Sequence, residues 1–251
     1  MSTERLTFPG STGATLAGVL HRPEGDPKGS VLLAHCFTCS KDLHTMTRLA
    51  RGLAEAGYAV LRFDFTGIGE SGGDFSKKTV SNNVRDIVAA ATALIQRGFG
   101  PCGLLGHSLG GAAVLLAAHR LRTVRSVAVL GAPSTPAHVR NLFIEHEEAI
   151  RREGEAVVEI AGRAFPVSLG FLDDLDRHDE AGELARLGRP LLVLHAVDDE
   201  TVPFSEGERI YASAEHPKGF VPLVGTDHLL TSKAAAEAAL GLVRAWFDTT
   251  L

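Results

Sequence analysis

Three kinds of residue at separated positions have the chemistry for nucleophilic catalysis: a serine flanked by glycines, an aspartate and a histidine. The segment CGLLGHSLGGAAVLLAAHR (102–120) places Ser108 in the pattern GxSxG, between an apolar stretch that predicts a strand and one that predicts a helix. Flanking glycines allow a tight, strained turn that exposes the serine oxygen to a substrate. We therefore predict that Ser108 is a nucleophile.

A second GxSxG match, centred on Ser71 in RFDFTGIGESGGDF (62–75), lacks this setting. The strand expected before Ser71 ends several residues earlier, and polar loop follows. The same loop contains GxGxxG at Gly67, Gly69 and Gly72, but no helix is expected to start there and bind a pyrophosphate. We expect neither a nucleophile nor a nucleotide site in this loop.

A serine hydroxyl needs a neighbouring base to take its proton, and the chain has 11 histidines. His228, in GTDHLL (225–230), follows the last expected strand and precedes the last expected helix, so we expect it at the same sheet edge as Ser108. His228 is the predicted base. His107 is expected to point away from the nucleophile and His195 to be structural. His178 and His216 are expected to be solvated.

The base needs a carboxylate to orient it, on the loop after the preceding strand. The segment HAVDDETVP (195–203) offers Asp198 and Asp199. Composition does not choose between them, because either residue has a structural alternative as a solvated loop charge or as a cap for the helix expected near Ser205.

Attack on a carbonyl creates an oxyanion, which two backbone N–H groups should stabilise. One expected donor is the N–H of Leu109, directly after the nucleophile. The other is expected from the turn AHCFTCSKD (34–42), where Phe37 is the best candidate. Cys36 and Cys39 in this turn have no second cysteine pair, so a zinc site is not expected, and nothing in the sequence supports a redox role.

The composition is that of a globular protein with a large core: 251 residues, 45% of them hydrophobic and 22% charged. The formal charge of −5 is not gathered into runs of one sign, which argues against a nucleic-acid partner. No window approaches the roughly 18 apolar residues of a membrane span, and no signal-like segment opens the chain. Three cysteines do not suggest a disulfide framework, so we expect a reducing, cytoplasmic location.

The expected elements form an α/β domain with a mainly parallel central sheet and helices on both faces. Residues 5–8 and 15–21 predict an antiparallel hairpin at a sheet edge. Two helices should end before Gly57 and Gly98. Further strands are expected over 30–35, 58–64, 102–107, 126–131, 190–195 and 219–224, and further helices over 109–121, 205–213 and 232–248.

The connection from Gly131 to Pro190 is far longer than a usual loop and is rich in charge. We expect an insertion over residues 134–188 that forms a cap or lid. Residues 157–168 within it predict a hairpin. Four apolar side chains of the insertion either face a substrate cleft or only anchor the insertion to the domain: Phe143, Phe165, Leu169 and Phe171.

The motifs GHSLGG, HAVDDETVP, GTDHLL and the HCF turn together resemble the α/β-hydrolase superfamily. The resemblance covers essentially the whole chain and implies one α/β-hydrolase domain over residues 1–251, in which the family pattern favours Asp199 as the acid. The chain departs from the pattern where Cys36 and Ala196 replace glycines.

Further segments resemble the hydrolase half of bifunctional proteins that carry an OsmC-like peroxide-reducing domain: AHCFTCSKD, RFDFTGIGESGGDF, GAPSTPAHV (131–139), FLDDL (171–175) and AEHPKGF (214–220). The chain stops at Leu251, just after its last expected helix, so no peroxidase activity is expected of it.

The expected function is hydrolysis of small to medium acyl esters through an acyl-enzyme on Ser108, with no cofactor and no metal. A thioesterase or an amidase with the same three residues is an alternative. A non-catalytic hydrolase-like domain that binds a small molecule is a second class, and the complete set of catalytic residues argues against it. The sequence does not predict the oligomeric state.

Overall fold

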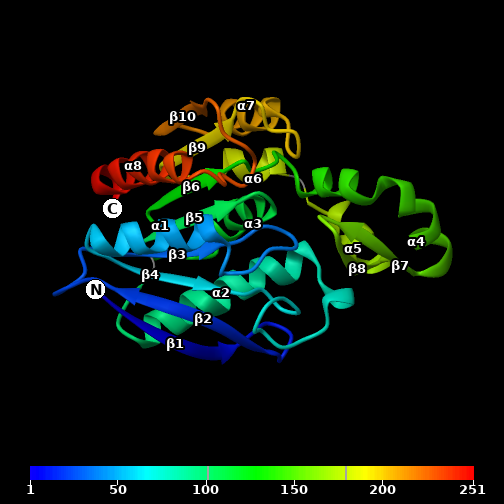
Figure 1. Cartoon of the computed structure of the whole chain (residues 1–251), viewed down its shortest axis with the longest axis horizontal. Coiled ribbons are helices and arrows are strands. Elements are labelled where there is room, and N and C mark those ends of the chain that lie inside the picture. Colours follow the sequence, from blue (N-terminus) through cyan, green and yellow to red (C-terminus); the bar gives the residue numbers. More distant parts are fainter. Residues whose placement is uncertain (101, 179) are drawn as a thin grey trace.

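The computed structural model describes residues 1–100, 102–178 and 180–251, and its centre is an eight-stranded sheet flanked by helices (Figure 1). The strands are β1 Ser2–Pro9, β2 Thr15–Arg22, β3 Gly29–Ala34, β4 Tyr58–Phe63, β5 Gly103–His107, β6 Ser126–Leu130, β9 Leu191–Ala196 and β10 Lys218–Leu223. Their order across the sheet is β1-β2-β4-β3-β5-β6-β9-β10. Pairing is antiparallel from β1 to β2 and from β2 to β4, and parallel between the other neighbours.

Helices cover both faces of this sheet. One face is covered by α1 (His44–Glu55) and α8 (Lys233–Thr250), which contact each other. The other face is covered by α2 Val80–Gln96, α3 Leu109–Ala118, α6 Glu180–Ala185 and α7 Phe204–Ser213. The expected mainly parallel α/β architecture is confirmed.

Alternate residues of each central strand enter two separate cores. In β3, Leu32 and Ala34 pack on the side of α2 and α3, whereas Val31 and Leu33 pack on the side of α1 and α8. A strand buried on both faces has no polar side, so its sequence is a continuous apolar run. The strands β3, β4, β5, β6 and β9 are buried in this way, and β10 is a half-exposed edge strand. All six agree with the strands predicted from apolar runs to within one residue at each end.

The helix boundaries also follow local chemistry. Gly57 and Gly98 have φ of 98° and 82°, and each follows the end of its helix, as predicted. Thr79 caps α2 by accepting a hydrogen bond from the Asn82 N–H at 3.0 Å. The helix predicted over 109–121 ends earlier, at Ala118, because the chain tightens into a turn there.

The insertion between β6 and β9 lies at the end of the sheet away from the two termini (Figure 1). It contains a 3₁₀ segment over Pro136–His146 (η2), then α4 Glu147–Glu153, β7 Glu155–Ile160, β8 Arg163–Ser168 and α5 Leu169–Leu175. β7 and β8 pair in antiparallel register, which confirms the predicted hairpin.

Aromatic side chains join the insertion to the main domain. Phe171 stacks on Phe37 with ring centroids 5.1 Å apart, and Phe165 packs on Phe75 at 4.9 Å. Phe143 is buried and contacts Phe171. Of the two interpretations of these side chains, the structure favours the anchoring one.

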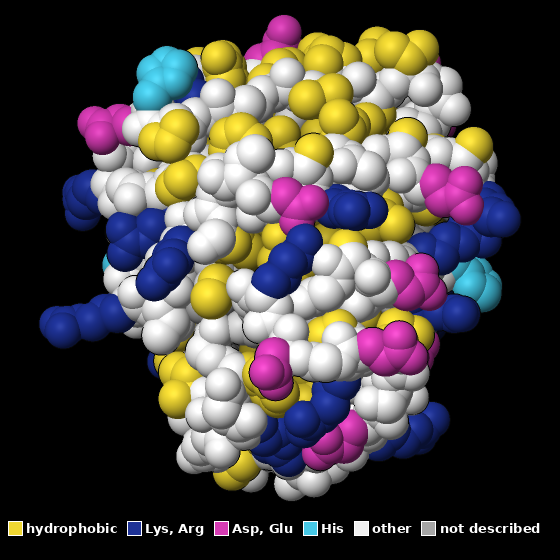
Figure 2. All heavy atoms as spheres, turned by 90° about the vertical axis from the view of Figure 1, so that its left-hand side faces the viewer, with side chains coloured by type: hydrophobic (Ala, Val, Ile, Leu, Met, Phe, Trp, Pro, Cys, Tyr) yellow, Lys and Arg dark blue, Asp and Glu magenta, His cyan; other side chains and the backbone are white. Residues whose placement is uncertain are grey.

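The surface opposite the insertion is mixed in charge. Figure 2 shows Lys and Arg side chains interspersed with Asp and Glu side chains on this face. In the described part of the chain, no helix is both long enough and apolar enough to span a membrane.

Candidate active site

Ser108 occupies the turn between β5 and α3, and its backbone is strained. Its φ of 53° and ψ of −128° lie in a region that side-chain-bearing residues rarely adopt, at a cost of about 1–3 kcal/mol. The Ser108 N–H donates to the Leu130 carbonyl at 2.9 Å, which ties the turn to β6. The strand-turn-helix setting predicted for Ser108 is present.

Glycines make this turn possible by close backbone approach. A Cβ on Gly106 would lie 2.5 Å from the Gly110 carbonyl oxygen, and a Cβ on Gly110 would overlap the His35 carbonyl oxygen. The first turn of α3 therefore packs directly against the end of β3. This contact brings the residue after Ser108 close to the turn that contains Phe37.

We expect Gly110→Ala to lower the free energy of unfolding by about 1–3 kcal/mol, because the added methyl group meets backbone atoms that cannot move aside cheaply. α3 must also shift, so kcat should fall by about 10²-fold. Urea unfolding and ester kinetics measure the two effects. The control is Gly241→Ala in α8, where no atom lies within 4 Å of the new Cβ; it should stabilise by about 0.5–1 kcal/mol without changing kcat.

His228 and Asp199 form a buried pair. The His228 Nδ1–H donates to Asp199 Oδ2 at 2.7 Å, and Asp199 Oδ1 accepts from the N–H groups of Thr201 and Val202 at 2.9 and 2.8 Å. Burial acts to raise the pKa of Asp199, but the hydrogen bonds from His228, Val202 and Thr201 outweigh it and lower that pKa below its ordinary value. Asp198 is exposed, and of the two candidates Asp199 is the one that contacts the His228 ring.

Within the described chain, Ser108 Oγ and the His228 ring form no hydrogen bond, which is common in the absence of substrate. Ser108 and His228 instead line two adjoining hollows that share Thr201.

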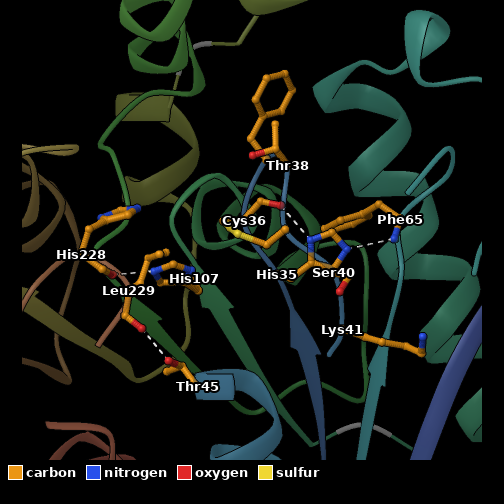
Figure 3. Close-up of a disulfide and its surroundings, with 12 residues drawn as sticks. His35, Cys36, Thr38, Ser40, Lys41, Thr45, Phe65, His107, His228 and Leu229 are labelled. Atoms are coloured by element: carbon orange, nitrogen blue, oxygen red, sulfur yellow. Dashed lines mark hydrogen bonds between the residues drawn. A yellow bond between two sulfur atoms is a disulfide. The ribbon is translucent and has the colours of Figure 1, made fainter. Parts of the chain in front are cut away.

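A second histidine fixes the loop of His228. The His107 Nε2–H donates to the His228 carbonyl at 2.8 Å, and the Thr45 hydroxyl donates to the Leu229 carbonyl (Figure 3). Burial lowers the pKa of His107 to about 3, so its imidazole is neutral. The nucleophile and base loops are thus joined through the residue before Ser108.

His195 is structural, as predicted. It is buried, and its Nε2–H donates to the Val202 carbonyl at 2.9 Å. His216 is exposed, as predicted. The prediction for His178 is wrong: its side chain is only 14% exposed and lies 3.3 Å from Asp174, because the turn that follows α5 brings it back to the last turn of that helix.

Ser71 has a structural role. Its hydroxyl donates to the Asp64 carbonyl at 2.6 Å and accepts from the Ala17 N–H at 2.9 Å. The loop from Gly67 to Gly72 closes on itself through a backbone hydrogen bond, and no helix begins in it. The expectation that no helix starts in this loop is confirmed.

The two predicted oxyanion donors lie on the wall of one pocket with Ser108. Neither the Leu109 N–H nor the Phe37 N–H donates to another residue in the described chain. The Leu109 N–H is free because it opens α3, where the first N–H groups have no partner within the helix.

The turn around Phe37 contains a feature that cysteine counting missed. Cys36 and Cys39 form a disulfide with their Cα atoms 5.3 Å apart, whereas Cys102 is free (Figure 3). His35 lies beside it: its Nδ1–H donates to the Cys36 carbonyl at 2.7 Å, and its Nε2 accepts from the Phe65 N–H at 3.2 Å. The link closes a single turn, from Cys36 to Cys39.

The pocket at Ser108 is small and mostly apolar. Its cavity volume is about 30 Å³, and it is lined by Phe37, Ser108, Leu109, Pro133, His138, Val139, Leu142, Thr201 and Val202. Sequence analysis missed the contribution of His138, Val139 and Leu142, whose only signal is their spacing on one turn of the insertion.

The larger hollow, of about 630 Å³, lies beside His228 and combines polar and apolar surface, with Asp198, Glu200 and Asp227 in its wall. In the described parts of the chain, no group of three or more His, Cys, Asp or Glu side chains is arranged to hold a metal ion.

Known proteins share this fold and sequence pattern. Residues 25–170 match the family described as serine aminopeptidase, S33. A solved esterase domain from a Rhodothermus marinus protein is 38% identical, covers 98% of both chains and superposes with a TM-score of 0.80.

Two curated relatives are more distant. The uncharacterized protein YfhR of Salmonella typhi is 25% identical over 229 residues, which is 90% of this chain and 74% of YfhR. The mitochondrial palmitoyl-protein thioesterase ABHD10 of Mus musculus is 27% identical over 161 residues, which is 61% of this chain and 53% of ABHD10. With the family match over more than half of its length, the chain belongs to the serine aminopeptidase S33 family of α/β-hydrolases.

Proposed function

We propose that the chain hydrolyses carboxylic esters through an acyl-enzyme on Ser108. The observation that carries the proposal is the buried His228–Asp199 hydrogen bond of 2.7 Å, next to a serine held in a strained strand-to-helix turn. A serine, a histidine and an oriented carboxylate, with free N–H groups nearby, have the geometry of acyl transfer. The 38% identical esterase domain supports an ester as the substrate.

In the first step, His228 Nε2 takes the proton of Ser108 Oγ as that oxygen bonds to the acyl carbon. The negative charge that develops on the carbonyl oxygen is stabilised by the N–H groups of Leu109 and Phe37. The intermediate then expels the alkoxide, which takes the proton from His228 Nε2. Water repeats the sequence: it gives a proton to His228, attacks the acyl carbon, and releases the acid as Ser108 Oγ regains its proton.

The space beside Ser108 favours a small acyl group. The apolar pocket there has a cavity volume of about 30 Å³, far below the roughly 300–1,000 Å³ that is usual for small-molecule sites. The hollow beside His228 is larger and open, so we propose that the leaving alcohol lies there.

We further propose that residues 134–188 act as a cap that shapes the acyl pocket, since His138, Val139 and Leu142 belong to its wall. The cytoplasmic location, the absence of a nucleic-acid partner, the single domain and the kinship with OsmC-linked proteins stay predictions.

Thioester hydrolysis is the second candidate, because the mouse relative is a palmitoyl-protein thioesterase. The chain matches only about half of that relative, and a palmitoyl chain is larger than the pocket described above. Amide hydrolysis with the same residues is the remaining alternative.

The test uses p-nitrophenyl esters from acetate to long acyl chains, matched thioesters, and labelling by a fluorophosphonate. We expect turnover that is highest for short acyl chains, and covalent labelling of Ser108. Thioester turnover that exceeds ester turnover would favour the second candidate. A folded protein that neither labels nor hydrolyses any of these substrates would indicate a non-catalytic binding domain.

A further inference from the structure

Lys78 is a buried lysine directly behind the turn that contains Phe37. It is 2% exposed and lies immediately before Thr79, the cap of α2. Its ammonium is surrounded by aromatic rings, with Nζ 5.2 Å from the ring centroids of Phe37 and Phe75 and 5.4 Å from that of Phe65. The ring faces attract the ammonium but accept no ordinary hydrogen bond from it, so its N–H donors need a further partner.

That contact is made with the backbone of the oxyanion turn. The Lys78 Nζ donates to the Phe37 carbonyl oxygen at 2.8 Å, and Nζ makes no other hydrogen bond within the described chain. Burial lowers the pKa of Lys78 to about 7, with the charge of Asp86 opposing the shift. The amine therefore exchanges full hydration for one carbonyl and three ring faces.

A second buried lysine shows how carboxylates can offset the cost of burying a lysine charge. Lys41 is also 2% exposed, but its Nζ donates to carboxylates of Asp42, Asp64 and Glu70 at 3.0, 2.8 and 2.6 Å. In the described residues, Lys78 has no carboxylate within ion-pair distance. Lys78 therefore lacks the carboxylate partners that compensate Lys41, and what distinguishes it is the carbonyl that it holds.

We propose that Lys78 is a positioning residue of the oxyanion hole, which holds the Phe37 carbonyl so that the Phe37 N–H faces the pocket at Ser108. The inference rests on the proposed function. The disulfide constrains the turn from Cys36 to Cys39, and the Lys78 bond fixes the peptide that follows Phe37. The Phe37 N–H belongs to the preceding peptide, whose Cys36 carbonyl accepts from the His35 Nδ1–H at 2.7 Å. With Lys78 on the next peptide, both peptides that flank Phe37 are fixed before charge develops, as an oxyanion donor requires.

The test is Lys78→Met, which keeps the length of the side chain and removes its donors. We expect kcat to fall by about 10²-fold with an unchanged KM, because the ground state does not need the oriented N–H. Affinity for a trifluoromethyl ketone, which forms the tetrahedral adduct, should fall by the same factor. The urea midpoint should stay equal or rise, since a buried amine is removed.

The matched control is Lys77→Met, because Lys77 is the exposed neighbour; its kcat, KM and midpoint should equal those of the wild type. The inference is wrong, and Lys78 is only structural, if Lys78→Met keeps the wild-type kcat. The same conclusion follows if its urea midpoint falls while the molecules that remain folded keep the wild-type kcat. If Lys78→Met does not fold, Lys78→Gln is measured in the same way with the same expectations, because its shorter side chain also leaves the carbonyl without its ammonium donor.

Measurements on the wild type distinguish a failure of the proposed function from a failure of the role assigned to Lys78. Failure of the wild type to hydrolyse esters or to label overturns the proposed function and this inference with it. Normal wild-type turnover with an equally active Lys78→Met overturns only the role of Lys78.

Discussion

Ser108→Ala should lower kcat/KM for p-nitrophenyl acetate by about 10⁴- to 10⁶-fold, because no other group in the site can form the acyl-enzyme. Alanine keeps a Cβ, so the strained φ of 53° and the urea midpoint should stay close to those of the wild type. Steady-state kinetics and labelling by a fluorophosphonate, which should disappear, measure the effect.

Ser71→Ala is the matched control, since Ser71 sits in the other GxSxG sequence of the chain. Its hydroxyl makes two structural hydrogen bonds, so the variant should lose about 1–2 kcal/mol of stability and keep its kcat. Retention of activity by Ser108→Ala, or loss of chemistry in folded Ser71→Ala, would place the nucleophile elsewhere.

Asp199→Asn should lower kcat by about 10⁴-fold while leaving the fold intact. The N–H groups of Thr201 and Val202 donate to Oδ1 of Asp199, so the asparagine must keep its carbonyl oxygen there. Its NH₂ group then faces His228 and donates to Nδ1, which forces the imidazole proton onto Nε2. An imidazole in that tautomer cannot accept the serine proton.

The control for this variant is Asp198→Asn, which changes the adjacent, exposed carboxylate in the same way. We expect Asp198→Asn to keep kcat within a few-fold of the wild type. The pH–rate profiles of both variants distinguish a change of imidazole tautomer from a loss of folded protein. Comparable activity of the two variants would contradict the role assigned to Asp199.

The strands that precede the site residues were predicted well from the sequence because they depend on local patterns. Parallel strands that are buried on both faces read as apolar runs, so the positions after β5 and β9 were identifiable. The edge strand β10 is half-exposed but contains a short apolar run of its own. Ser108, Asp199 and His228 all follow such strands. The choice between Asp198 and Asp199 came only from the family pattern, because two adjacent aspartates are equivalent until the loop closes around one of them.

The parts that sequence reasoning missed depend on contacts between distant segments. A lysine before a helix is normally a solvated residue, so nothing in the sequence marks Lys78 as buried against Phe37. His178 was expected in solvent because its neighbours are polar, yet it lies against Asp174. Phe165 and Phe171 were ambiguous until their partners in the main domain were known.

The strained backbone at Ser108 opposes thermal stability to catalytic activity. Glycine adopts a φ of 53° without the steric cost of a Cβ, so Ser108→Gly releases strain of about 1–3 kcal/mol, partly offset by the greater freedom of glycine in the unfolded chain. A laboratory selection for heat resistance alone would therefore favour the loss of the reactive hydroxyl. Directed evolution of a more robust catalyst from this scaffold has to select for turnover in every round, and should look for its gains away from this turn.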